Sequence, residues 1–490
     1  MAKIIPKVFI WLLMICPLPA SAQFISWDSF MEQLFMEVES EGEEAVDGIE
    51  NLYEDYVYLH ANPININRAD SVELKRLGIL TGPQIESICH YINRYGALQG
   101  VGELMLVPGL DYYTRQLLSY FVTFGELEEE NEDARSMWHR MLTRGHSELS
   151  TRLDIPLYQR AGYAPRTQSQ LDASPSRYYT GNALYHNLRY NYRYDTRLSW
   201  GISMEKDAGE PIFTATSPLP DYLSGYIQLG DMGILQNLVV GNYRLQFGQG
   251  LILNSNFALG KNMLLQGLER QPVTIKPHRG TNESDYYTGV AGTVAWRAWQ
   301  FTAFASYRRL DATLNGVSIS TLKTDGYHRT PLEHSCRGNT RGNLFGGHLG
   351  YASHGFHLGM TAMYQSFNRN FVLSKQDYKR YAPQGHAFFN ASVDYAWHHH
   401  RLSIVGETAV DRKGSVATLN TLRLKAADRV YVTLLQRYYA HDFWALEGKS
   451  FSTSSDLRNE QGIYLGAEWQ PHRKLQIAAY ADASDQVADG

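Results

Sequence analysis

An alternation of apolar and polar residues with a period of two constrains this chain more than any other feature of its sequence. From Glu148 onward, helical spacing gives way to segments in which every second residue is apolar, the clearest at 186–195, 198–203, 299–308, 430–438 and 463–469. Segments of about ten such residues, separated by turns, are typical of a transmembrane β-barrel with an apolar outside and a polar lumen. A soluble β-sandwich also has alternating strands and is the competing interpretation.

Three features favour the barrel over the sandwich: the strands are long, their polar faces carry Arg and Asp, and aromatic residues gather at the segment ends, as at Trp296 and Trp299. The turns predict roughly fifteen strands. Short turns at 351–356, 397–401 and 470–474 are expected at one end of the barrel, and longer loops at 323–341 and 442–459 at the other. The sequence finishes ADASDQVADG without a terminal aromatic strand, so we expect a barrel truncated at its C-terminus.

The N-terminus predicts export from the cytoplasm. Lys3 and Lys7 precede an apolar run that ends at Ala20-Ser21-Ala22, which is the pattern of a secretory signal peptide over residues 1–22. With 490 residues, the chain is long enough for at least two structural units. Cys89 and Cys336 remain after cleavage, which is too few for a disulfide framework.

Residues 23–61 form a strongly acidic segment whose apolar residues, among them Phe30, Leu34 and Val38, recur at helical spacing. Asn62-Pro63 ends the helical pattern. Two interpretations stay open: a solvated helical lid on the next module, and a helix that docks on a partner.

Residues 62–124 contain short amphipathic helices separated by the tight turns Thr81-Gly82-Pro83 and Pro108-Gly109-Leu110. The entry INRA at 66–69, with Glu73-Leu74, Tyr95-Gly96 and Val107-Pro108-Gly109, resembles the helix-hairpin-helix domains of the ComEA-like type. The resemblance implies an all-α module in which hairpin N–H groups hold DNA phosphates without reading bases. The implied contacts are Thr81, Gly82, Gly109, Leu110 and Arg115.

The charge of this module does not favour DNA. Its basic and acidic residues nearly balance, Asp111 places a carboxylate in the second hairpin, and acidic residues flank it on both sides. Non-specific binding to duplex DNA depends mainly on Lys and Arg at the phosphates. Residues 125–146 are predicted to be an acidic linker to the barrel at 147–490.

No cofactor, catalytic or metal site is predicted. His398-His399-His400 is expected in a tight hairpin, Glu333-His334-Ser335-Cys336 lacks zinc-ligand spacing, and Gly248-Gln249-Gly250 is expected to mark close packing or a bulge within a strand. A sharper hypothesis concerns lumen charges that either set solute preference or fill a closed barrel with ion pairs: Arg189, Arg193, Asp195 and Arg197.

The sequence therefore predicts an α + β multidomain protein, a small helix-hairpin-helix module followed by an antiparallel outer-membrane β-barrel. The expected role is non-catalytic, in envelope transport or assembly, with the module in the periplasm docking a partner protein or the barrel mouth. The alternative is a DNA-uptake component that binds duplex DNA. Outer-membrane lipid is the expected surrounding of the barrel.

Overall fold

The structure is a computed structural model. It describes residues 27–28, 30–32, 52–53, 55–110, 112–125, 134–213, 219–255, 274–353, 355–372, 381–427, 429–454, 456–472 and 475–487. The predicted signal peptide, most of the acidic segment and residues 126–133 of the predicted linker lie outside these ranges. No helix among the described residues is long and apolar enough to cross a membrane.

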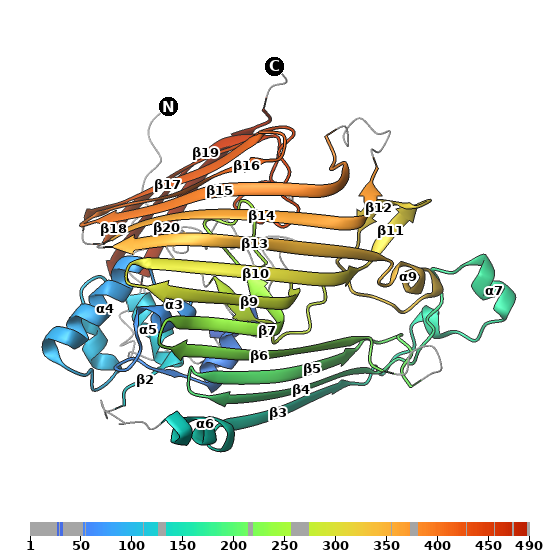
Figure 1. Ribbon diagram of the computed structural model, residues 1–490, viewed down its shortest axis with the longest axis horizontal. Coiled ribbons are helices and arrows are strands. Elements are labelled where there is room, and N and C mark those ends of the chain that lie inside the picture. The colour runs from blue at the N-terminus through green and yellow to red at the C-terminus, as the bar shows by residue number, and fades with distance from the viewer. Residues whose placement is uncertain are drawn as a thin grey trace, which may run out of the picture.

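Eighteen of the described strands form one large sheet that curls around an interior (Figure 1). Three are short: β8 (Ile275–Pro277), β11 (Ala312–Asn315) and β12 (Ser318–Leu322). The others have nine to sixteen residues. They are β3 (His146–Asp154), β4 (Tyr185–Tyr194), β5 (Leu198–Lys206), β6 (Tyr222–Met232), β7 (Leu235–Leu245), β9 (Tyr287–Trp296), β10 (Trp299–Leu310), β13 (Thr340–Ser353), β14 (Phe356–Phe371), β15 (Gly385–His399), β16 (Leu402–Asp411), β17 (Val416–Ala427), β18 (Val430–Tyr439), β19 (Glu460–His472) and β20 (Leu475–Asp485).

Consecutive long strands pair antiparallel, which confirms the predicted sheet. The long strands match the expected number of about fifteen. The three short ones were missed because a strand of three to five residues is too brief to show a period. β3 pairs with β4, and β20 pairs with β19. β3 and β20 are the first and last members of this series of paired strands, and both of their faces are largely exposed.

The wall is apolar on its outer face and polar on its inner face. On β10, Phe301 and Tyr307 are 52% exposed whereas Thr302 is 1% exposed. On β14, Met360 is exposed and Thr361 buried. This arrangement is the reverse of a soluble protein and is the one that strands of a membrane barrel require.

Exposed aromatic side chains gather where the strands make short turns. They lie at the ends of β9, β10, β14, β15 and β19, and they are Trp296, Trp299, Phe356, Trp397 and Trp469. We call this the turn end of the barrel and the opposite one the loop end. The loop end carries the β11–β12 hairpin and the helices α7 (Gln168–Ala173) and α9 (Pro331–Cys336).

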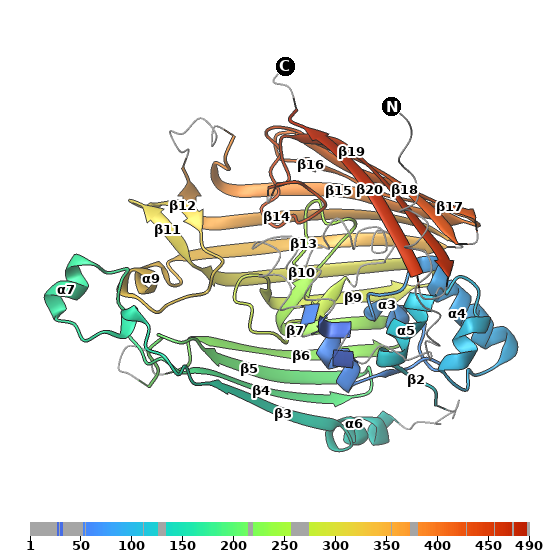
Figure 2. The same cartoon turned by 180° about the vertical axis from the view of Figure 1, so that it is seen from behind.

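A small helical module lies at the turn end (Figure 2). It consists of α3 (Ser71–Arg76), α4 (Gly82–Tyr95), the 3-10 helix η2 (Val101–Leu106) and α5 (Tyr112–Phe121), closed by a parallel pair of β1 (Ile64–Asn65) and β2 (Val122–Thr123). Leu74, Ile88 and Leu118 are fully buried in its core. The helix α6 (Ala134–Thr143) follows and leads into β3.

Helical residues 55–61 pack on this module and also reach the barrel. Tyr56 stacks on Phe121 with ring centroids 5.4 Å apart, and Trp27 stacks on His60 at 4.1 Å. The described residues of the acidic segment therefore cover the module, as the lid interpretation predicts, and they also contact the barrel, while docking on a partner stays a prediction.

Candidate functional site: the occupied interior of the barrel

The interior of the barrel holds the helix at 55–61. Asp55 Oδ1 accepts a hydrogen bond of 2.5 Å from Arg244 on β7, and its Oδ2 accepts one of 3.1 Å from Lys276 on β8. The side chains of Arg244 and Asp55 are 3% and 11% exposed. A buried carboxylate is stable as an anion only with such partners. The acidic helix is thus fastened to the wall by a buried ion-pair network, which we call the Asp55 latch.

The charges of the latch determine the protonation of Asp55. Burial opposes ionisation, but the positive charges of Arg244, Lys276 and Arg279 outweigh it and lower the pKa of Asp55 to about 2. Asp55 therefore remains ionised at any physiological pH.

Aromatic and backbone contacts extend the latch along the same helix. The guanidinium of Arg279 lies 3.7 Å from the ring centroid of Tyr58, which is cation–π geometry. Arg193 Nη1 donates a 2.9 Å hydrogen bond to the carbonyl oxygen of Asn62, where the helix ends. Between the helix and the wall lies a cavity of about 120 Å³.

The four predicted lumen charges separate in the structure. Arg189 lines a large cavity of about 1080 Å³ towards the loop end, and Arg193 contacts the helix. Asp195 and Arg197 lie in the turn between β4 and β5, where Asp195 has φ 50° and its carbonyl oxygen accepts a bond from Arg193. A role in the lumen thus stays a prediction for Arg189 and Arg193, whereas the other two belong to the turn end.

A second occupant of the interior is the segment after β7. Gly248-Gln249-Gly250 was expected within a strand, but β7 ends at Leu245 and the chain turns inward. Leu251 and Ile252 are fully buried in the main core of the barrel. Glu407 Oε2 accepts the backbone N–H groups of Gln249 and Leu251 at 2.7 and 3.1 Å.

The two glycines make this inward turn possible. Gly248 and Gly250 have φ of 53° and 82°, a region that side-chain-bearing residues rarely adopt. A Cβ atom at Gly250 would lie 2.4 Å from the carbonyl oxygen of Lys449, so the main chains approach too closely for any larger residue.

The segment between β18 and β19 leaves the wall at the loop end, where a long loop was predicted, but part of it folds into the interior. Phe443 is 1% exposed and Phe451 8% exposed, and both pack in the core with Leu251. The backbone N–H of Asn254 donates to the carbonyl oxygen of Glu447 at 2.9 Å. The two inward loops therefore pack on each other, because their apolar side chains are better buried in the interior than exposed to water.

The predicted DNA-contact residues lie in the module as follows. Thr81 is the N-cap of α4, with a capping box in which Gln84 N–H donates to Thr81 Oγ1 and Thr81 N–H to Gln84 Oε1. Gly82 and Leu110 are buried, Gly109 has φ 85°, and Arg115 is half-buried. Asp111 lies outside the described residues.

A cleft of about 630 Å³ separates the two hairpins from the turn end of the barrel. Its module side includes Thr81 and Gly109, and its barrel side carries basic residues of the turns, namely Arg401, Lys425 and Arg429. Glu86 on α4 accepts a 3.2 Å bond from the backbone N–H of Gly355 and thereby joins the module to the β13–β14 turn. The predicted contacts do not form one exposed surface, because four of the five face this cleft or are buried.

The histidine-containing motifs lie in the following elements. His398 and His399 are the last residues of β15 and His400 begins the tight turn to β16, while the ring of His399 stacks on Trp397 at 5.6 Å. Glu333 completes the capping box of α9 with Thr330. Two other groups bring possible metal ligands together among the described residues: His348 with His357 and Asp394, and His328 with Glu210 and Asp221. Sequence analysis missed both, since their members come from separate strands and loops.

No protein-family model matches this chain, and no curated protein does. Among solved structures, mutants of the Rhodopseudomonas blastica porin are 11% identical, with a TM-score of 0.27, covering 61% of this chain and 86% of theirs. An anion-selective porin from Comamonas acidovorans is also 11% identical, with a TM-score of 0.27 and coverage of 62% and 80%. OmpT of Vibrio cholerae has the same identity and TM-score, with coverage of 62% and 79%. Likenesses at this level carry no argument about the chain, and its resemblance to ComEA-like domains stays a prediction.

Proposed function

We propose that this protein is a non-catalytic outer-membrane β-barrel of a Gram-negative bacterium, and that it conducts a solute when its N-terminal helix leaves the interior. The outer face of the wall supports the membrane location, because rows of exposed apolar residues end in aromatic side chains at the turn end. In such barrels the short turns face the periplasm, which would place the helical module there.

The Asp55 latch is the observation that carries the gating role. The helix at 55–61 is held in the interior mainly by charges and by Tyr58, rather than by the apolar core that holds the two inward loops. A segment fastened by a few ion pairs is released by a change that removes one of them. The helix is therefore the part of the interior suited to move.

A conductance experiment tests this role. In Asp55→Asn, Arg244 and Lys276 lose their counter-charge, and removing one partner of a buried ion pair costs about 3–5 kcal/mol. We expect the open probability of the full chain in planar bilayers to rise at least about tenfold, which corresponds to about 1.4 kcal/mol.

The matched control is Glu103→Gln, which removes the charge of a carboxylate that accepts a hydrogen bond from the backbone N–H of Gln99 within the module. It should conduct like the unmodified protein. A heat-dependent shift in gel mobility shows that each variant has a folded barrel. If folded Asp55→Asn protein stays as closed as the control, the gating role is wrong.

A periplasmic partner protein would supply the signal for release. The module exposes Tyr95, Met105 and Leu106, which are 67%, 59% and 58% exposed. Three apolar side chains on one small module suit a protein surface better than a nucleic acid. Binding there would compete with the contacts that hold the module at the turn end.

Duplex DNA is the second candidate ligand of the module, and the basic turn residues Arg401, Lys425 and Arg429 are the observation in its favour. Against it, the capping box of α4 already occupies the N–H groups of Thr81 and Gln84. Binding of the detergent-solubilised full chain to duplex DNA across a salt series decides the matter. Micromolar binding with a steep salt dependence supports the DNA role, and no binding at low salt excludes it.

A further inference from the structure

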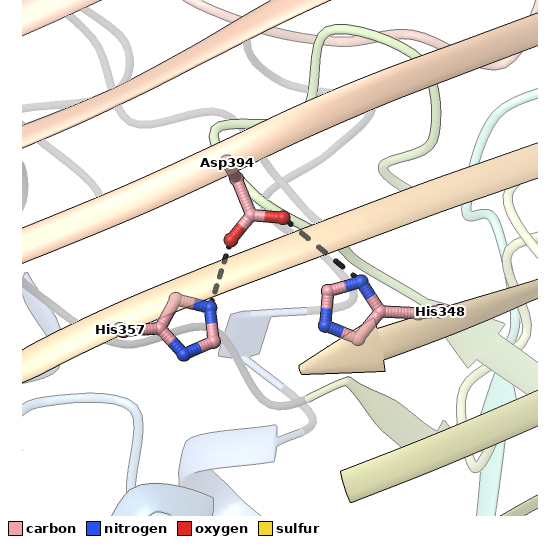
Figure 3. Close-up of side chains that lie close together, drawn as sticks. All are labelled: His348, His357 and Asp394. Carbon is pink, nitrogen blue, oxygen red and sulfur yellow. Dashed lines mark hydrogen bonds and ion pairs between the residues drawn. The ribbon is translucent and has the colours of Figure 1, made fainter. Parts of the chain in front are cut away.

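Two histidines and an aspartate from three neighbouring strands meet on the inner face of the wall (Figure 3). His348 lies on β13, His357 on β14 and Asp394 on β15, and one ligand atom of each lies within 4.8 Å of the other two. His357 Nε2 is 2.8 Å from Asp394 Oδ2, and His348 Nδ1 is 3.9 Å from Asp394 Oδ1. The side chains of His348 and Asp394 are each 6% exposed, whereas that of His357 is 29% exposed.

Strand register and two glycines produce this arrangement. Gly350, Gly359 and Asp394 stand level on β13, β14 and β15. His348 and His357 are each two residues from a glycine and so share its face. A Cβ atom at Gly359 would lie 2.4 Å from Asp394 Oδ1 and 2.6 Å from His348 Cε1. The glycines leave the space into which the three side chains point.

The ring of His348 is oriented by a neighbour. Its Nδ1 lies 2.9 Å from Thr361 Oγ1, the residue directly opposite on β14. When Nδ1 donates to this oxygen, Nε2 retains the lone pair that a metal needs. Histidine ligands usually have such a partner on the second ring nitrogen.

The charge of the group favours a bound cation. Asp394 Oδ1 is buried and has no hydrogen-bond partner among the described residues. Glu407 is fully buried and lies directly opposite Asp394 in the register of β15 and β16. Two carboxylates therefore stand side by side on the inner face. Buried carboxylates in this proximity are stable only when a cation or a proton compensates them.

We propose that His348, His357 and Asp394 bind one divalent first-row transition-metal ion, such as zinc, in the wall of the barrel. Two imidazole nitrogens and one carboxylate suit zinc and its neighbours, whereas calcium and magnesium prefer oxygen ligands alone. The ion replaces the hydrogen bond between His357 and Asp394 and links β13, β14 and β15. Its role is structural, close to the Glu407 anchor of the inward loop.

Zinc titration of the EDTA-treated full chain in detergent tests the proposal. We expect one zinc ion per chain with micromolar or tighter affinity, and cobalt as a probe should give the visible absorption of a coordinated ion. Asp394→Asn and His357→Gln should each weaken binding at least about 100-fold. His386→Gln and His399→Gln, near the two ends of the strand that carries Asp394, should bind as the unmodified protein does.

A thermal measurement separates a metal site from a hydrogen-bonded brace. A ligand that binds only the folded state raises the unfolding temperature. Zinc should raise the temperature of the heat-dependent gel shift in the unmodified protein but not in Asp394→Asn. Gly359→Ala keeps every ligand and fills the space between them, so it should also lose zinc binding. It provides the test if Asp394→Asn does not fold. Absence of binding by the folded, unmodified protein overturns the proposal, as does unweakened binding by Gly359→Ala or Asp394→Asn.

Discussion

The interior of this barrel is filled by two kinds of segment, and they are held in different ways. The loops after β7 and β18 are joined to strands at both ends and pack through apolar residues such as Leu251, Phe443 and Phe451. The helix at 55–61 precedes the module in the chain and is held in the interior by Asp55 with Arg244 and Lys276. Apolar packing is non-directional and spread over many contacts, while an ion-pair network fails when one charge is lost. The two inward loops are thus a fixed part of the interior, whereas the helix at 55–61 is able to leave the interior.

The largest effect on the barrel itself is expected in the loops. In Gly250→Ala, the new Cβ atom would lie 2.4 Å from a main-chain oxygen at a φ of 82°, which cannot be relieved by moving a side chain. Overpacking costs about 1–3 kcal/mol and the left-handed backbone about 1–2 kcal/mol. We expect a lower temperature of the heat-dependent gel shift without a change in open probability.

Gly414→Ala is the matched control for this variant. Its φ is 88°, but nothing lies within 4 Å of the added Cβ atom, so it carries the backbone cost alone. If both variants lower the unfolding temperature equally, the close approach of the two inward loops contributes nothing to stability.

Whether the sequence predicts a feature of this interior depends on how far apart along the chain the residues of that feature lie. The wall was predictable because a period of two is a local pattern in each strand, as in Phe301 to Tyr307. The Asp55 latch joins residues 189 positions apart, and Glu407 holds an N–H group 158 positions away. Neither pair has a local signal, and the acidity of the first segment alone could not identify its partner.

The proposed metal site shows the same limit. His348, His357 and Asp394 are brought together by strand register, which turn lengths determine only approximately. Gly248 and Gly250 did give a local signal, since two glycines so close together mark an unusual backbone. That signal located the turn but could not indicate that it faces inward.

The pH dependence of the latch should produce a smaller effect. Because the pKa of Asp55 is lowered to about 2, its ionisation contributes to docking fully above its ordinary pKa near 4 and is lost as the pH falls through 2. The difference corresponds to about 2 kcal/mol. Open probability should therefore be constant from pH 7 to about 4 and rise below it.

Asp55→Asn has no charge to lose, so its open probability should not change in the acidic range. A rise of equal size in that variant would assign the acid response to another group. It would also remove the distinction between the charged latch and the apolar loops.

The smallest effect is expected at the loop end, where charge also holds the segment around His328. His328 lies between Asp221, which bonds its Nδ1, and Asp311, which is 2.6 Å from its Nε2. Burial lowers the pKa of His328, but the hydrogen bonds and charges of these carboxylates outweigh it and raise the pKa to about 10. The stabilisation of this segment by protonated His328 is complete below the ordinary pKa near 6.5 and is lost as the pH rises through 10, which is the opposite of Asp55.

Tryptic cleavage after Arg329 in detergent should accelerate about tenfold towards pH 10, which corresponds to about 1.4 kcal/mol of local opening. His328→Gln should be cleaved rapidly at every pH, while His386→Gln should keep the pH dependence of the unmodified protein. A pH-independent rate in the unmodified protein would mean that charge does not hold this loop, and that release on loss of a charge is peculiar to the N-terminal helix.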